Sequence, residues 1–201
     1  IDHHALFAPI TKASFAATHD NVAEIMQKAL TIALTEPMGP VHIDLPEDVS
    51  LAPANDDVVR PIKIELTPEE TNENNLNNTN SLISEAERPL VVLGSSAMRM
   101  QKPELLQAFV EHHEIPFLTS TMAKGMIDED HRLSIGCIER GRRQIQRKFI
   151  QSADLIIGLG FDTIEVEYEA WIGNTPLLSI DIEDPDIADS VNLVGTMTGN
   201  I

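Results

Sequence analysis

The strongest constraint on the fold is the regular alternation of short apolar runs with helical segments in the second half of the chain. These apolar runs predict strands at 90–93, 116–119, 154–159, 177–182 and around 191–195. Helical spacing predicts helices over 103–113 and 139–152, and a turn and loop between 119 and 139. Strands separated by helical crossovers run parallel, and helices then cover both faces of the sheet. The second half is therefore predicted to be an α/β domain built on a parallel sheet.

The first 50 residues predict a smaller strand-helix-strand unit. A strand over 14–17 precedes a helix that Asp20 can cap, and a second strand over 41–45 is closed by Pro46. Two strands and one helix are too small to bury their own faces. We expect a proline-rich linker over 51–66, followed by a domain over 67–201 whose first helix begins at a Thr67–Glu70 capping box.

Composition limits the partners and the compartment. The net charge of −18 argues against nucleic acid and anionic membranes, since both repel an acidic surface. No apolar run approaches the roughly 20 residues that span a bilayer. Cys137 is the only cysteine, so no internal disulfide can form and we expect a cytoplasmic protein; a catalytic thiol is a minor alternative. Because the chain begins at Ile1 rather than methionine, we expect it to be part of a longer protein.

The carboxyl ends of the predicted strands are where a ligand would bind, because loops meet at that edge of a parallel sheet. Glycine allows close approach of the backbone, and hydroxyl groups can bond phosphate oxygens. The candidate cofactor-binding residues at these ends are Gly94, Ser95, Ser96, Thr119, Thr121, Gly160, Asp162, Asp181 and Ile182. The alternative is that the same residues only form tight turns.

Several familiar sites are missing from the sequence. The turn after 90–93 is not G-x-G-x-x-G, and Thr119 stands where a ribose-binding acid would follow the second strand, so a nicotinamide dehydrogenase is disfavoured. Lys124 could meet a phosphate or could be a solvated surface lysine. We predict no metal site, because the acids of the 181–189 segment lack the glycine and terminal glutamate of a calcium loop and no zinc spacing occurs.

Five segments resemble, in family order, the thiamine-diphosphate enzymes of the acetolactate synthase and pyruvate oxidase group. They are "LFAPITKASF" (6–15), "GPVHIDLPEDV" (39–49), "AERPLVVLGSSA" (86–97), "IPFLTSTMAKGMIDEDHRLSIG" (115–136) and "ADLIIGLGFD" (153–162). The resemblance covers nearly the whole chain. It implies that 1–50 ends the pyrimidine-binding domain and that 67–201 is the central domain, a six-stranded parallel Rossmann-like sheet.

The resemblance also implies what the whole enzyme would do. It would be a carboligase or decarboxylase that uses thiamine diphosphate and magnesium, acts on a 2-oxo acid such as pyruvate, works with the remaining domains of the same enzyme and forms a homo-oligomer. The family's G-D-G…N motif does not occur in this sequence, and its activating glutamate would lie before Ile1. We therefore expect this chain to scaffold the enzyme and to contain no catalytic residue.

The family's central domain binds FAD in some members, ADP in others and nothing in the rest. Members with FAD carry an "RFDDR"-like stretch where this chain reads "GFDTIE" (160–165), without either arginine, so FAD is not expected. "STMAKG" (120–125) is similar to the ADP-binding decarboxylases, which implies a phosphate contact for Lys124 and a ribose contact for Asp181. We expect no nucleotide or weakly bound ADP; the alternative reading is a free-standing adenine-nucleotide-binding module.

Overall fold

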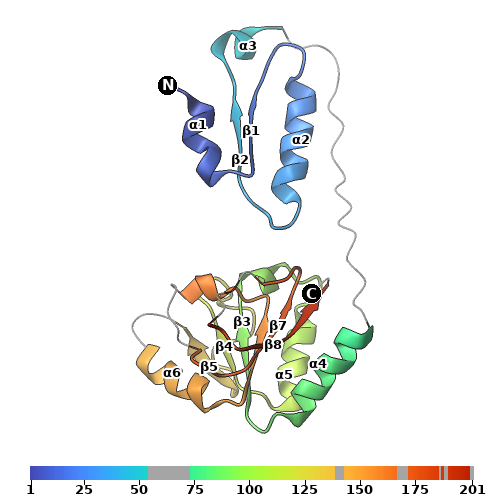
Figure 1. Cartoon of the computed structure of the whole chain (residues 1–201), viewed down its shortest axis with the longest axis vertical. Helices are drawn as coiled ribbons and strands as arrows, with labels where there is room; N and C mark the ends of the chain where they lie inside the picture. The colour runs from blue at the N-terminus through green and yellow to red at the C-terminus, as the bar shows by residue number, and fades with distance from the viewer. Residues whose placement is uncertain (54–72, 139–142, 167–171, 186, 188–189, 200–201) are drawn as a thin grey trace. The chain divides into compact units, whose positions relative to one another are not determined.

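The computed structural model describes residues 1–53, 73–138, 143–166, 172–185, 187 and 190–199. The chain divides into two compact units, Ile1–Thr67 and Pro68–Ile201 (Figure 1). Most of the expected linker, and the Thr67–Glu70 capping box, lie outside the described residues. Each unit is therefore considered by itself.

The first unit contains two parallel strands joined through a helix, which confirms the predicted strand-helix-strand arrangement. Strands β1 and β2 pair with Ala13 opposite Val41 and Ala16 opposite Asp44. The elements in order are α1 (His3–Phe7), the 3-10 helix η1 (Ala8–Ile10), β1 (Ala13–Ala16), α2 (Val22–Leu34), β2 (Val41–Asp44) and α3 (Glu47–Leu51). The short helices α1 and α3 were not predicted, since neither is long enough to show a helical period.

The predicted cap of helix α2 at Asp20 is wrong. The residue that precedes the helix is Asn21, which makes no side-chain bond to the helix; its Oδ1 instead accepts from the Thr18 amide at 2.7 Å, in the turn before the helix. At the other end Lys12 Nζ donates to three carbonyl oxygens, those of Ile32, Thr35 and Pro37, at 2.6–2.8 Å. A cation at this position stabilises the carbonyl end of a helix.

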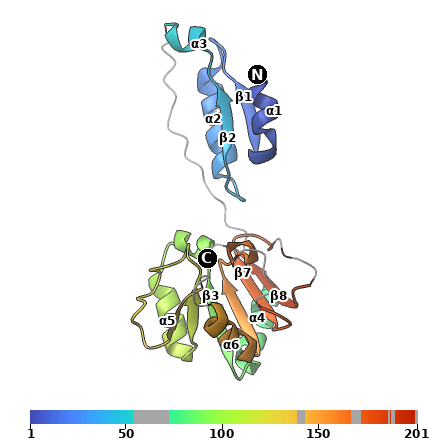
Figure 2. The same cartoon turned by 90° about the vertical axis from the view of Figure 1, so that its left-hand side faces the viewer.

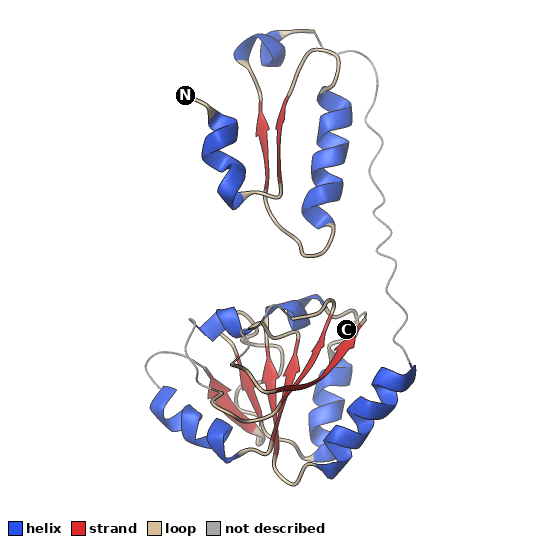
Figure 3. Ribbon diagram, viewed as in Figure 1, coloured by secondary structure: helices blue, strands red, loops and turns tan. Residues whose placement is uncertain are grey.

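The second unit is a six-stranded, all-parallel sheet, as predicted for this fold class (Figure 3). The strand order is β5-β4-β3-β6-β7-β8, so the order reverses between β3 and β6. The strands are β3 (Pro89–Leu93), β4 (Phe117–Thr119), β5 (Ser134–Cys137), β6 (Leu155–Leu159), β7 (Leu177–Asp181) and β8 (Leu193–Thr198). This is the doubly wound order, in which ligands bind where the direction of winding changes.

Both faces of the sheet are buried, which explains why its central strands read as continuous apolar runs. Val91 and Leu93 point to the face that α4 (Glu73–Glu85) and α5 (Glu104–His113) cover. Leu90 and Val92 point to the opposite face, covered by α6 (Arg143–Ser152) (Figure 2). These four side chains are at most 1% exposed. The core is mainly aliphatic, as expected from an aromatic content of 4%.

The sequence did not predict strand β5, which lies in the stretch expected to be a loop. Ser134 and Gly136 interrupt its apolar pattern, Gly136 has a positive φ of 100°, and the register with β4 shifts between Phe117 and Leu118. A short strand at the sheet edge with such an irregularity gives no clear alternation. Strand β8 was also predicted too early, at 191–195 instead of 193–198.

Candidate functional site

The candidate site lies at the carboxyl ends of β3 and β6, where the strand order reverses. The 3-10 helix η2 (Ser95–Arg99) follows β3, and the 3-10 helix η3 (Thr163–Val166) follows β6. The two turns are bonded directly, since the Gly94 amide donates to the Leu159 carbonyl and the Ser96 amide to the Gly160 carbonyl, each at 3.0 Å. Predicted residues from two strand ends therefore do meet at this edge of the sheet.

The carboxylate of Glu165 lies between these turns and accepts hydrogen bonds from three segments of the chain. Oε1 accepts from the Ser95 amide at 3.0 Å, from Ser95 Oγ at 3.1 Å and from the Asp162 amide at 3.1 Å. Oε2 accepts from the Ser95 amide at 3.1 Å and from Ser120 Oγ at 2.5 Å. Two amides and two hydroxyls therefore converge on one half-buried carboxylate.

The sequence analysis gave Glu165 no role. Its only distinguishing feature in the sequence is its position after the strand that ends at Gly160, and Glu167 and Glu169 follow it closely. Nothing in that run of acids marks one as the side chain that turns back to the sheet. Ser120 appeared only as the first residue of the "STMAKG" segment, without a role of its own.

Gly94 and Gly160 are required by the contact between the two turns. A Cβ on Gly94 would lie 2.3 Å from the Gly160 carbonyl oxygen and 2.7 Å from Glu165 Oε1. A Cβ on Gly160, whose φ is +57°, would lie 2.2 Å from the Ala97 amide nitrogen. The two glycines thus allow the turn after β3 to contact the turn after β6, which is the structural use that the tight-turn alternative gave them. No room for a side chain remains between the two turns at these positions.

Asp181 ends β7 beside this contact. Its Oδ1 accepts from the Ile182 amide at 2.6 Å. Burial raises the pKa of Asp181 above its ordinary value; the bonds from Ile182 and Ser96 and the charge of Arg99 act against this, whereas the nearby Glu165 adds to it. A half-buried second carboxylate therefore stands close to the first.

The remaining predicted residues have other surroundings. Thr119 is 2% exposed, and its Oγ1 has no hydrogen-bond partner. Thr121 is exposed. Lys124 forms an ion pair with Glu129 at 3.1 Å, with more than a third of each side chain exposed. Their proposed nucleotide contacts stay predictions.

Metal binding has no visible support in the part of the chain that the structure describes. No group of three or more histidine, cysteine, aspartate or glutamate side chains is placed there so that it could hold an ion. Asp186 and Asp189 of the predicted acidic loop lie outside the described residues.

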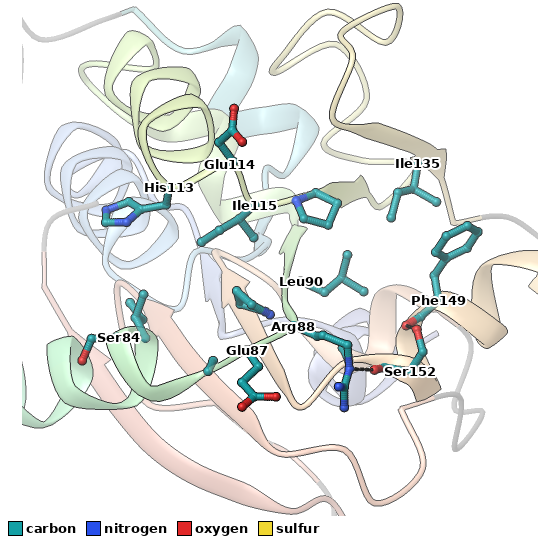
Figure 4. A pocket seen from close by; sticks show the side chains of 15 residues that line it. Ser84, Glu87, Arg88, Leu90, His113, Glu114, Ile115, Ile135, Phe149 and Ser152 are labelled. Atoms are coloured by element: carbon teal, nitrogen blue, oxygen red, sulfur yellow. Dashed lines mark hydrogen bonds between the residues drawn. The ribbon is translucent and has the colours of Figure 1, made fainter.

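A pocket of 510 Å³ opens at the opposite, amino-terminal edge of the sheet (Figure 4). Its wall includes Arg88, Leu90 and Phe149, and none of the predicted site residues lines it. Arg88 Nε donates to the Ser152 carbonyl at 2.9 Å, and the Asp154 carboxylate accepts from the Arg88 amide at 2.9 Å. These bonds join the starts of β3 and β6, so the polar groups here have a structural use.

We predict that Gly160→Ala is far more destabilising than Gly173→Ala. Both glycines have nearly the same φ, +57° and +62°, but a Cβ on Gly173 would meet nothing within 4 Å. Gly173→Ala should cost only the left-handed backbone penalty of about 1 kcal/mol. Gly160→Ala adds a backbone overlap and should cost about 3 kcal/mol or more in total. Urea unfolding of both variants measures the difference, and equal losses would contradict the close contact.

We predict that Asp181→Asn stabilises the protein at neutral pH. Because the folded-state pKa is raised, the stability that Asp181 contributes is present below its ordinary value of 3.8 and is lost as pH rises through the folded-state pKa. Asparagine keeps an acceptor for the Ile182 amide without the charge. The gain in unfolding free energy should be below about 1 kcal/mol, since Asp181 is only half-buried.

The pH dependence of this effect is the decisive measurement. The difference between wild type and Asp181→Asn should shrink as pH falls through the folded-state pKa and disappear below 3.8, where Asp181 is neutral in both the folded and the unfolded state. The exposed Asp184→Asn is the control and should change unfolding little. A difference that grows toward low pH would mean that the charged form of Asp181 is stabilising.

Comparison with known proteins agrees with this fold. Residues 76–200 match the family model described as "Thiamine pyrophosphate enzyme, central domain". The fold is also similar to a solved structure of an enzyme from Mycobacterium smegmatis that is assigned as thiamin diphosphate-dependent. The match has a TM-score of 0.73 and covers all of this chain and 39% of the M. smegmatis chain. At 24% identity this likeness shows the fold alone.

Curated relatives extend the match to the first unit. The chain is 30% identical over its whole length to the "Probable acetolactate synthase large subunit" of Methanococcus aeolicus, covering 35% of that protein. It is 27% identical to oxalyl-CoA decarboxylase of Escherichia coli, with 96% of this chain and 34% of the relative covered. The chain thus spans about a third of the length of these relatives. Among the helices that the structure describes, none is long and apolar enough to span a membrane. The chain belongs to the thiamine pyrophosphate enzymes and carries their central domain.

Proposed function

We propose that this chain is part of a carboligase or decarboxylase that uses thiamine diphosphate and magnesium and acts on a 2-oxo acid such as pyruvate. The observation that carries the proposal is the match of residues 76–200 to the central domain, together with the acetolactate synthase relatives that also match the first unit. The role proposed for the chain within that enzyme is to scaffold the domains that hold the cofactor.

The chemistry of the cofactor is assigned to parts of the enzyme beyond this chain. Thiamine diphosphate would supply the carbanion that attacks a 2-oxo acid. The diphosphate would need a metal and its ligands, and the described residues offer no such group. No catalytic step is therefore assigned to a residue of this chain.

The first unit supports a role in a larger assembly. Helix α2 exposes Met26, Leu30 and Leu34 by 40–45% on one side. These residues are spaced four apart, so they form an apolar stripe along one side of the helix. Monomeric proteins seldom expose such a stripe to solvent. We propose that the rest of the pyrimidine-binding domain covers the stripe, and that the enzyme is a homo-oligomer in the cytoplasm.

Turnover tests the proposed division of labour. The chain alone, given thiamine diphosphate, magnesium and pyruvate, should release no carbon dioxide and form no acetolactate. A longer polypeptide that adds the regions found in the relatives should decarboxylate a 2-oxo acid. Turnover by the chain alone would overturn the scaffold role, and a folded, cofactor-loaded longer enzyme without activity on any 2-oxo acid would overturn the proposed reaction.

We further propose that the purified protein holds no FAD and binds ADP weakly at most. Neither arginine of the FAD-binding pattern is present at 160–165, and each charge-assisted contact is worth about 1.5–3 kcal/mol. An absorbance scan should show no flavin band, and calorimetry with ADP should give a Kd no tighter than about 0.1 mM, or −5.5 kcal/mol. A yellow protein would refute the first expectation, and tight ADP binding would favour a nucleotide-binding module.

A further inference from the structure

We propose that Glu165 is an internal occupant of an oxyanion site, which its carboxylate closes to the phosphate groups of external ligands. The site is formed by the amides of Ser95 and Asp162 and the hydroxyls of Ser95 and Ser120. The chemical class that this donor set would take, once the side chain is removed, is a phosphate or diphosphate group.

The donors are of the type and arrangement that bind oxyanions. Ser95 lies 70 residues from Glu165 and Ser120 lies 45 residues away, yet both reach the same carboxylate. Amides of successive turns and hydroxyl groups are the usual donors to phosphate oxygens when no arginine or lysine takes part. Because the fold brings them together from the ends of β3, β4 and β6, they form a site of the sheet and not a local turn motif.

The position of the carboxylate is the position of a ligand in this topology. Strand order reverses between β3 and β6, and the crevice outside that pair of strands is where doubly wound sheets bind their ligands. Glu165 lies on η3, three residues after Asp162. Its side chain turns back toward the ends of β3 and β6, where it accepts from the Ser95 and Asp162 amides. The chain thereby satisfies the donors with its own charge.

Tethering makes this occupant hard to displace. A carboxylate held by a short loop competes at an effective concentration on the order of millimolar or higher. An external phosphate in place of the Glu165 carboxylate would also be repelled by Asp181, whose charge interacts unfavourably with that of Glu165 and favourably with that of Arg99. We therefore expect binding of phosphate to wild type to be at least tenfold weaker than to a chain without the Glu165 side chain.

The test is titration of Glu165→Ala with inorganic phosphate. Backbone amide resonances of Ser95 and Asp162 report directly on the donors, so saturable shifts of both should appear in Glu165→Ala. The matched control is Glu104→Ala, which removes the same charge from an exposed position at the start of α5 and should behave like wild type. A Kd at least tenfold lower for Glu165→Ala than for wild type and the control is the expected result.

Other outcomes would overturn the proposal. A folded Glu165→Ala whose Ser95 and Asp162 amides do not respond to phosphate would show that the donors form no oxyanion site. Wild type that binds phosphate as tightly as Glu165→Ala would show that the carboxylate does not block it. If Glu165→Ala is unfolded, phosphate should restore folding where sodium chloride of equal ionic strength does not; failure to restore it would also overturn the proposal.

A parallel titration with ADP identifies the source of the anion. A lower Kd for ADP than for phosphate would indicate that the crevice also contacts the nucleoside, and equal constants would indicate an anion site alone; either result supports an oxyanion site that Glu165 closes. The inference concerns the weak-ADP part of the proposed function but not the reaction. A failed turnover assay therefore leaves it standing, and its own failure leaves the 2-oxo acid reaction standing.

Discussion

The backbone contact between the turns after β3 and β6 is the constraint on which the candidate site depends. Gly94 and Gly160 let the two turns approach within hydrogen-bond distance, and the Ser96 amide to Gly160 carbonyl bond joins them. The contact occurs between β3 and β6, where the described sheet reverses its strand order and the chain connections leave in opposite directions. In a sheet of this order an open crevice would normally lie there, so the contact decides how much room a ligand has.

The contact between the two turns brings the charges of Glu165 and Asp181 close together at this edge of the sheet. The Ser95 and Asp162 amides both point at the partly buried Glu165 carboxylate, and an amide left without a partner in a buried position would cost about 1–3 kcal/mol. Glu165 satisfies them, but it also brings a negative charge close to Asp181, which contributes to the raised pKa of that group. Arg99 and the hydroxyl of Ser96 offset part of this repulsion.

The parts of the fold that could be predicted are those whose burial produces a recognisable apolar pattern in the sequence. The residues of Leu90–Leu93 and Leu155–Gly158 are buried, with side chains on both faces of the sheet, so their apolar runs and parallel pairing could be predicted directly. Strand β5 lies at an edge and contains Gly136, so nothing in its sequence distinguishes it from a loop. At the candidate site, the sequence predicted that residues at strand ends lie together, and their ligand contacts stay predictions. Glu165 was missed because its position depends on how η3 returns to the sheet, and no local sequence pattern encodes that path.

In this architecture a single side chain, that of Glu165, can occupy the donors at the strand ends while the sheet itself stays the same. The strand order, the glycine turns and the hydroxyls of Ser95 and Ser120 are all compatible with a phosphate-binding edge. A carboxylate at position 165 uses the same donors without any change in the sheet. The sheet can therefore stay folded whether or not a ligand is bound. The energy that stabilises it comes from its two apolar faces, whereas the energy that would bind a ligand comes from a few donors at its edge.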